Sequence, residues 1–449
     1  DYKSAKIWSL ETPKLYILKA TFSNKKSTDT RELRFGFRWF TAEGIGNDAL
    51  LRLNGQRIRL TSAISWGFWG RNGLFPTHEL AEREIKAAKT LGMNCIQFHR
   101  NVGKSEVLDL QDQMGLYRYM EPGGGQTALG EKYSLYAPSP SDYVDPSGKG
   151  GEPSTFAEKY MEEKIIRMIR DHRSHPSLLL WCIQNEMHPD LHNPRIFYLI
   201  KRMQKEDPSR IIVLKSGFPT GTPSVNQVWV LPYDTTIYYD KGDGYSGWWD
   251  DHTVGGPGVW RDEMYRGPEN FTHRSENKKE IVMWGEMLGA AVPDNHETIV
   301  QEIKESSGNS YDLAEHQEIL NSYNKFLDRW GFRKAFPTAG ALFTAIGDKS
   351  YDFWGRVIET ARLSEVNDYH VISGWESTSI ENHSGLVDNM RNFKGNPSLI
   401  RKRLEPLRPV IKFHSLIVEK DSCTKFDLYL LNETHTPHGD RVNVWYKLP

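Results

Sequence analysis

Two glutamates end apolar stretches of this 449-residue sequence, and each stretch has the length of a buried β-strand. Glu186 follows the run LLLWCIQN at 178–185, and Glu286 follows IVMWG at 281–285. In a closed barrel of parallel strands, side chains at the carboxyl ends of the strands meet at one mouth. Two carboxyl groups held there roughly 5 to 5.5 Å apart can cleave a glycosidic bond, because one attacks the anomeric carbon while the other protonates the departing oxygen.

A strand-end glutamate also has an ordinary explanation, since it can begin a loop or cap the next helix. The amide of Asn185 beside Glu186 favours the catalytic interpretation, because an amide there can hydrogen-bond a sugar 2-hydroxyl as the transition state forms. The two glutamates are separated by about three strand–helix units, which predicts that they end the fourth and the seventh strand of the barrel.

The elements that must position these groups follow a strand–helix rhythm from about residue 76 onward. This rhythm predicts an α/β fold of the (β/α)8 TIM-barrel class, flanked by partial β-sandwich segments. We expect 1–42 to end one β-sandwich, 43–408 to form the barrel, and 409–449 to begin another sandwich. The barrel strands are predicted at 94–98, 116–120, 178–183, 211–214, 235–239, 281–284 and 371–375, with long loops at 138–154 and 242–260.

Composition excludes several classes of partner. The formal net charge is −1 with 26% charged residues, so no electrostatic excess is available to hold nucleic acid or an anionic membrane. No apolar run approaches the roughly 20 residues of a membrane span. Three scattered cysteines indicate neither a disulfide framework nor a zinc site. The 14 Trp and 20 Tyr could present flat apolar faces to sugar rings, although a large aromatic core would also use them.

The segment RSHPS at 173–177, followed by QNE at 184–186, resembles the acid/base signature of glycoside hydrolase family 2. That family contains β-galactosidases, β-glucuronidases and β-mannosidases. The resemblance implies an immunoglobulin-like sandwich before the barrel and a sugar-binding jelly-roll domain that this sequence lacks. Further matches occur in order at 8–9, 13–16, 36–38, 53–55, 91–94, 112–116 and 385–388.

The resemblance also implies roles for individual residues. Glu186 matches the general acid/base and Glu286 the nucleophile, while Tyr238 matches a tyrosine that hydrogen-bonds the nucleophile. Trp375 matches a tryptophan that lines the subsite of the departing sugar. Ordinary barrel packing is the alternative for Tyr238 and Trp375. The implied activity is that of a retaining exo-β-glycosidase, most similar to a β-galactosidase, with a carbohydrate substrate and without metal or cofactor.

Two departures from the family pattern concern the sugar pocket. Where the family has Arg and His after the second strand, this sequence has Gln97 and Arg100 with a displaced His99, and either His99 or Arg100 could contact substrate. Near the end of the barrel, Asn382 matches the asparagine of an Asn-x-Lys motif that reads a sugar carboxylate in β-glucuronidases. Its lysine is replaced by Ser384, which disfavours that mode of uronic-acid recognition.

Several alternatives stay open at this point. A carbohydrate-binding pseudoenzyme on the same barrel, a β-glucuronidase or a β-mannosidase would fit much of the pattern. An inverting or endo-acting hydrolase would hold its carboxyl groups roughly 6.5 to 9.5 Å apart. An aromatic wall of Trp248, Trp249 and Trp260 could stack on a sugar or pack on a neighbouring domain. Homo-oligomerisation is left open, and a periplasmic or secreted location is the working expectation.

Overall fold

The computed structural model describes most of the chain. The described residues are 4–68, 76–123, 156–186, 191, 194–217, 227–252, 278–287, 292–306, 308, 310–377, 385–414 and 417–434.

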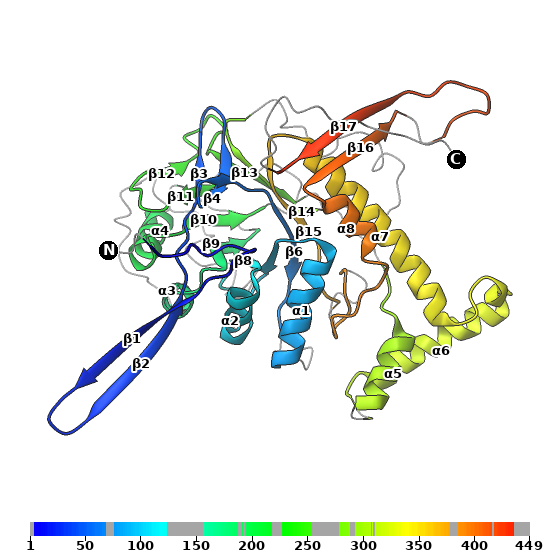
Figure 1. Cartoon of the computed structure of the whole chain (residues 1–449), viewed down its shortest axis with the longest axis horizontal. Helices are drawn as coiled ribbons and strands as arrows, with labels where there is room; N and C mark the ends of the chain where they lie inside the picture. Colours follow the sequence, from blue (N-terminus) through cyan, green and yellow to red (C-terminus); the bar gives the residue numbers. More distant parts are fainter. Residues whose placement is uncertain are drawn as a thin grey trace.

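Eight parallel strands form the ring at the centre of the molecule (Figure 1). Each of the seven neighbouring pairs from β10 round to β13 is parallel, in the order β10-β9-β8-β7-β6-β15-β14-β13. In chain order β9 is the fourth strand and β14 the seventh, which confirms the predicted positions of the two glutamates. The strands are β6 (Leu60–Ser65), β7 (Cys95–Phe98), β8 (Tyr117–Met120), β9 (Leu178–Asn185), β10 (Ile211–Ser216), β13 (Trp248–His252), β14 (Ile281–Met287) and β15 (Asn367–Ile372).

The fifth and sixth strands of the ring, β10 and β13, are joined by contacts at their carboxyl ends. The amide of Gly217 donates to Oδ2 of Asp250 over 2.9 Å, and Oγ of Ser216 lies 3.3 Å from Nε2 of His252. Two further strands, β11 (Val228–Val230) and β12 (Ile237–Tyr239), extend the sheet from β10 in antiparallel pairing. The predicted barrel strand at 235–239 is therefore wrong, because β12 lies outside the parallel ring and β13 takes that place.

Helices cover the outside of the ring (Figure 1). Helix α1 illustrates how the sequence sets their limits: Thr77 caps its first turn by accepting from the amide of Leu80, and Gly92 ends it with a φ of 88°. The helices are α1 (His78–Leu91), α2 (Ser105–Met114), α3 (Phe156–His172), α4 (Pro194–Glu206), α5 (His296–Ser306), α6 (Leu313–Arg329), α7 (Ala339–Leu363) and α8 (Ser398–Arg401), with short 3-10 turns at Phe332–Lys334 and Lys402–Leu404.

Alternation along each strand separates two hydrophobic clusters. On β9, Leu180 and Cys182 face the barrel interior, whereas Trp181 and Ile183 pack in the layer beneath the helices. The same alternation turns Glu186 toward the interior at the mouth. The interior cluster is closed at the amino ends of the strands by the sheet of β3 (Phe40–Glu43), β4 (Leu50–Leu53) and β5 (Gln56–Arg57).

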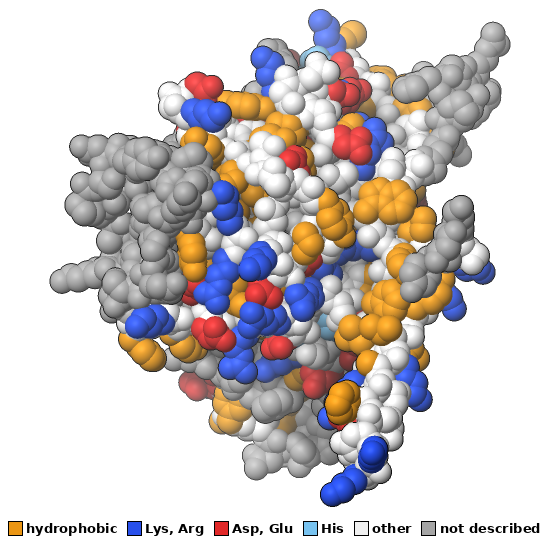
Figure 2. All heavy atoms as spheres, turned by 90° about the vertical axis from the view of Figure 1, so that its left-hand side faces the viewer, with side chains coloured by type: hydrophobic (Ala, Val, Ile, Leu, Met, Phe, Trp, Pro, Cys, Tyr) orange, Lys and Arg blue, Asp and Glu red, His pale blue; other side chains and the backbone are white. Residues whose placement is uncertain are grey.

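Two hairpins flank the barrel, where the sequence predicted sandwich segments. The β1 (Tyr16–Ser23) and β2 (Thr28–Phe35) hairpin projects from the body, and β16 (Leu407–Phe413) pairs with β17 (Phe426–Asn432) near the opposite side (Figure 1). The first hairpin exposes Ile17, Leu18, Phe22 and Leu33, and hydrophobic side chains lie along the projecting segment in Figure 2. Among the described helices, none combines the length and the apolar character needed to cross a membrane.

Candidate active site

Glu186 and Glu286 converge at the carboxyl ends of β9 and β14. A carboxylate oxygen of each residue and a ring nitrogen of His252 all lie within 4.8 Å of one another. The side chain of Glu186 is 19% exposed and that of Glu286 10%, so both are sheltered while retaining access to solvent. Two carboxyl groups at this spacing, open at one side, can act on opposite sides of a single small reacting centre.

Both carboxylates lie at local irregularities of the backbone. Glu186 has a φ of 48°, a conformation that costs a non-glycine residue free energy, and its amide donates to the carbonyl of Ser216 over 2.8 Å. Glu286 lies where the register between β14 and β15 shifts, between Trp284 and Met287. A bulge of this kind turns a side chain away from the face that simple alternation would give it.

His252 lies between the two glutamates. Its Nδ1 is 2.9 Å from Oε1 of Glu186 and 3.6 Å from Oε1 of Glu286. The ring is buried, which by itself lowers the pKa of His252, but the Glu286 charge, the hydrogen bond to Glu186 and the Asp250 charge raise that pKa to about 9. The imidazole is therefore protonated at neutral pH.

Two glycines, one just after β10 and one on β14, make room for this ring. A Cβ at Gly217, whose φ is +58°, would lie 2.0 Å from Cδ2 of His252. A Cβ at Gly285 would lie 2.8 Å from Nε2 of His252 and 2.5 Å from Oδ1 of Asp250. Because backbone approaches the ring from both strands, His252 has little freedom to move away from the carboxylates.

Arg100 and His99 bring the end of β7 into the site. Nη2 of Arg100 donates to Oε2 of Glu186 over 2.9 Å, and with its amide oxygen turned toward the guanidinium, Asn185 accepts from Nε at 3.1 Å and Nη2 at 2.9 Å. Nε2 of His99 lies 3.5 Å from Oε1 of Glu286. Burial, Arg100 and His252 hold the pKa of His99 well below its usual value, so the ring approaches Glu286 in its neutral form.

A third glutamate, Glu121, fixes the backbone of the same segment by a hydrogen bond. Glu121, just after β8, accepts from the hydroxyl of Tyr119 at 3.0 Å and from the amide of Arg100 at 2.9 Å. Burial raises the pKa of Glu121 to about 7, even though both hydrogen bonds and the Arg100 charge oppose that shift. Glu121 thus fixes the backbone of Arg100, whose φ of 52° is also in the left-handed region.

Two other residues expected at the site lie elsewhere or are buried. Tyr238 is on β12, outside the parallel ring, and its ring stacks on Trp229 with centroids 4.5 Å apart. The contacts described for it do not reach Glu186 or Glu286, so the structure does not place it beside the nucleophile candidate. Trp375 follows β15 at the rim and donates its amide to the carbonyl of Ile64 over 2.6 Å, but its indole is fully buried.

The remaining expectations concern the aromatic wall and Asn382. Trp248 and Trp249 are buried within β13, where Trp249 packs edge-on against Trp284 at 4.9 Å, so neither forms an exposed wall. Trp260 and Asn382 lie outside the described residues.

His252 is the main functional candidate that the sequence reasoning missed. The rule that identified Glu186 and Glu286, a polar residue ending a strand, applies equally to the segment WWDDH at 248–252. That segment lies in the stretch 242–260, whose glycine and tryptophan content predicts a loop, yet it forms β13 and both of its aspartates are buried. Alternation from Trp248 would have placed His252 on the interior face.

The carboxylates of Glu186 and Glu286 with His252 are also the residues that could hold a cation at the mouth. Nδ1 of His252 lies within hydrogen-bond distance of Oε1 of Glu186, at 2.9 Å, and 3.6 Å from Oε1 of Glu286. The geometry therefore supports acid–base and nucleophilic chemistry by the side chains themselves.

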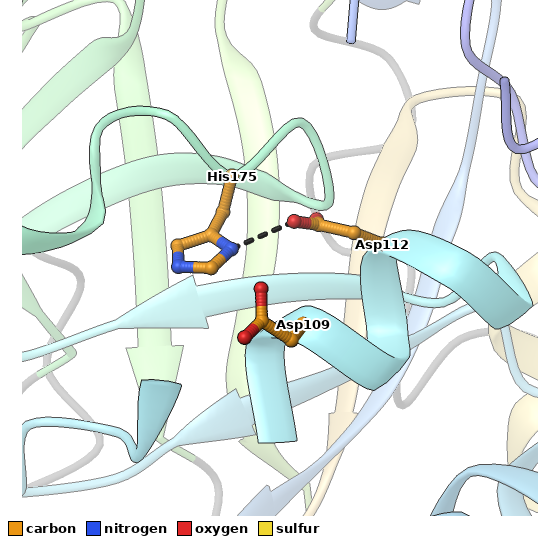
Figure 3. A group of neighbouring side chains, drawn as sticks. All are labelled: Asp109, Asp112 and His175. Atoms are coloured by element: carbon orange, nitrogen blue, oxygen red, sulfur yellow. Dashed lines mark hydrogen bonds and ion pairs between the residues drawn. The ribbon is translucent and has the colours of Figure 1, made fainter. Parts of the chain in front are cut away.

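A second group of possible ligands, Asp109, Asp112 and His175, lies near the amino end of β9, away from the mouth (Figure 3). Nδ1 of His175 is 2.7 Å from Oδ2 of Asp112, and the other Asp112 oxygen accepts from the amide of Ser177 at 3.0 Å. The carbonyl of Asp112 also accepts from the indole of Trp8. These bonds fix the turn before β9, which gives the RSHPS segment a structural purpose.

Comparisons with known proteins agree with this arrangement. The model described as "Glycosyl hydrolases family 2, TIM barrel domain" matches residues 47–253, and the model "Glycosyl hydrolases family 2" matches 1–38. The chain is 28% identical over 223 residues to a putative beta-glucuronidase of Formosa agariphila, and 27% identical over 221 residues to a beta-galactosidase of Halalkalibacterium halodurans. These alignments cover 49% and 48% of the chain but only 19% and 20% of the relatives.

Solved structures share the fold. Bacteroides uniformis beta-glucuronidase 3 superposes with a TM-score of 0.54 at 15% identity, covering 90% of this chain and 45% of that one. The Amycolatopsis orientalis exo-chitosanase CsxA gives a TM-score of 0.56 at 15% identity, covering 91% and 46%. The chain thus spans less than half the length of these structures.

Proposed function

We propose that this chain, which belongs to glycosyl hydrolase family 2, carries the active site of a retaining exo-β-glycosidase that removes terminal β-linked sugars by double displacement. The observation that carries the proposal is the approach of the Glu186 and Glu286 carboxylates to within 4.8 Å at the barrel mouth. Retaining enzymes hold their carboxyl groups about 5 to 5.5 Å apart, whereas inverting enzymes need roughly 6.5 to 9.5 Å to admit water between them.

In the first step, an oxygen of Glu286 attacks the anomeric carbon while Glu186 gives its proton to the departing oxygen. The bond between the anomeric carbon and the departing oxygen breaks, and a glycosyl ester forms on Glu286. In the second step, Glu186 removes a proton from water, whose oxygen attacks the anomeric carbon and releases Glu286. Asn185 accepts from Arg100 beside the acid, and to its amide we assign a contact with a sugar hydroxyl.

The substrate favoured by this proposal is a β-galactoside, because several relatives are named beta-galactosidases. A β-glucuronide is the second candidate, since two relatives are named putative beta-glucuronidases and Arg100 supplies a cation at the site. Arg100 is 32% exposed and pairs with Glu186, so it would have to serve the acid and a sugar carboxylate together.

A panel of aryl β-glycosides of galactose, glucuronic acid, mannose and glucose tests the proposal. We expect hydrolysis of one member, with proton NMR showing the β-anomer as the first product. First release of the α-anomer would show that the enzyme inverts the anomeric configuration, which contradicts the retaining mechanism. Sugar binding without hydrolysis of any member would favour a carbohydrate-binding pseudoenzyme.

A further inference from the structure

His252 occupies a position that the double-displacement scheme does not by itself require. It contributes neither the attacking oxygen nor the group that meets the departing oxygen, yet its Nδ1 faces both catalytic candidates, at 2.9 Å from Glu186 and 3.6 Å from Glu286. The shorter distance and the donor character of Nδ1 direct its hydrogen to Glu186.

We propose that His252 holds the proton that Glu186 delivers to the departing sugar oxygen, and that it receives the proton back when Glu186 deprotonates water. This inference rests on the proposed function, and it makes His252 a positioning residue that acts through Glu186. It assigns the resting state of the pair as an imidazolium beside a carboxylate.

The charges around the ring support this resting state. Glu186 faces it from β9, Glu286 from β14 and Asp250 from its own strand, while Arg100 and the neutral His99 approach from the end of β7. Ser216 on β10 meets the other ring nitrogen with its hydroxyl at 3.3 Å. Since the anionic neighbours raise the pKa of His252 to about 9, the proton resides on the ring at neutral pH.

Protons and charges balance over the two steps. As substrate binds, the Nδ1–H bond of His252 breaks and an O–H bond forms on Glu186, so both groups become neutral. Glu186 then gives that proton to the departing oxygen while Glu286 forms the glycosyl ester, which leaves a single negative charge on Glu186. In the second step a proton from water passes to Glu186 and on to His252, and the ester oxygen leaves as the Glu286 carboxylate.

The surroundings keep the ring in place for this exchange. Backbone at Gly217 and Gly285 closes in on it from β10 and β14, and Ser216 fixes the distal nitrogen. A ring that could swing away would lose the short contact to Glu186 that proton exchange needs.

The test measures kcat/KM against pH for the full chain and its His252→Gln variant, using the sugar identified by the aryl panel. Two leaving groups are compared: 2,4-dinitrophenol, which departs without protonation, and 4-methylphenol, which needs it. We expect the alkaline limb of the 4-methylphenyl profile, near pH 9 in the wild type, to move down by about one unit or more in the variant. The variant should also lose about tenfold more activity on the 4-methylphenyl than on the dinitrophenyl substrate.

His414→Gln is the matched control, because His414 lies just after β16, pairs with Asp427 at 3.0 Å and is 53% exposed, and its profile should follow the wild type. His252→Asn provides a second variant if His252→Gln melts at a much lower temperature. An unmoved alkaline limb together with equal losses on both substrates would overturn the proton-holding role alone. Absence of hydrolysis by the wild type on every sugar would instead overturn the proposed function.

Discussion

Arg100 donates to Oε2 of Glu186 over 2.9 Å, on the side of the carboxylate opposite His252. The acid/base candidate is thus held between two cationic groups that come from different strands. Arg100 is in turn fixed by Asn185 and by Glu121, so a chain of hydrogen bonds sets the direction of the Glu186 carboxylate. Precise orientation of an acid is worth a large part of its contribution to the rate.

Replacing Arg100 with Met should therefore reduce kcat/KM on the preferred aryl glycoside by roughly 10- to 100-fold. That range corresponds to the loss of one charge-assisted hydrogen bond, about 1.5 to 3 kcal/mol. Arg83→Met is the control, since Arg83 pairs with Glu302 on the surface with a side chain 48% exposed, and it should alter kcat/KM less than about twofold. Equal losses of kcat/KM in the two variants would show that Arg100 does not contribute to catalysis.

Glu286→Gln should abolish nearly all turnover, with a fall in kcat of about four orders of magnitude or more, because an amide cannot form the glycosyl ester. Stopped-flow or long-incubation assays on the dinitrophenyl glycoside give the residual rate. Glu32→Gln, on the exposed hairpin where Glu32 pairs with Lys19 at 3.6 Å, should behave as wild type. Survival of activity in Glu286→Gln would mean that another group is the nucleophile.

The sequence could predict the barrel and the two glutamates because β9 and β14 begin with continuous apolar runs, 178–183 and 281–284, and a Glu follows each run within three residues. Parallel strands buried on both faces need such runs. It could not predict β13, since three buried polar residues, Asp250, Asp251 and His252, interrupt the pattern. Their burial is made tolerable only by tertiary partners such as Gly217 and Glu186, which lie far along the chain. The family resemblance implies a site role for Tyr238, but the short strand that carries it pairs antiparallel with β11 outside the parallel ring.

The helices between β14 and β15 show a different limit. Residues 296–363 fold as α5, α6 and α7, and the boundary signals are present, for example Thr338 accepting from the amide of Ala341 at the start of α7. The strand–helix rhythm expects one helix between consecutive barrel strands, so an added pair, α5 and α6, departs from the repeat. Figure 1 shows α5 and α6 extending away from the ring, with α5 joined to α1 by the pair of Glu302 and Arg83 at 3.5 Å.

Gly217→Ala should destabilise the fold and reduce activity together. The new methyl group would meet Cδ2 of His252 at 2.0 Å, and the φ of +58° is strained for alanine. Gly244→Ala separates backbone strain from steric contact, because Gly244 has a φ of +74° with nothing within 4 Å of its Cβ position. We expect a loss of about 1 kcal/mol in the free energy of unfolding for Gly244→Ala and about 2 to 4 kcal/mol for Gly217→Ala, measured by urea titration.

Asp368→Asn should flatten part of the dependence of stability on pH. Burial raises the pKa of Asp368 to about 7 in the folded chain, whereas an unfolded aspartate has a pKa near 3.9. The folded state therefore binds the proton more tightly, so the free energy of unfolding falls as pH rises from about 4 to 7. The asparagine keeps an oxygen to accept from the amide of Val282 and has no charge to bury, so it should be more stable than wild type above pH 7. An equal dependence of the free energy of unfolding on pH in the wild type and in Asp368→Asn would contradict this prediction.

Glu84→Gln tests a fully buried ion cluster beneath the barrel wall. The Glu84 carboxylate accepts from Arg118 at 3.0 Å and from Arg391 at 3.1 and 3.0 Å, and all three side chains are 0% exposed. A neutral amide leaves Glu376, 3.9 Å from Nη2 of Arg391, as the acidic neighbour of two buried guanidinium groups, which should cost about 3 to 5 kcal/mol in the free energy of unfolding. Glu82→Gln, on the same helix and paired with Lys86 in solvent, should cost about 0.5 kcal/mol or less. Similar melting temperatures for the two variants would show that Arg118 and Arg391 find other partners.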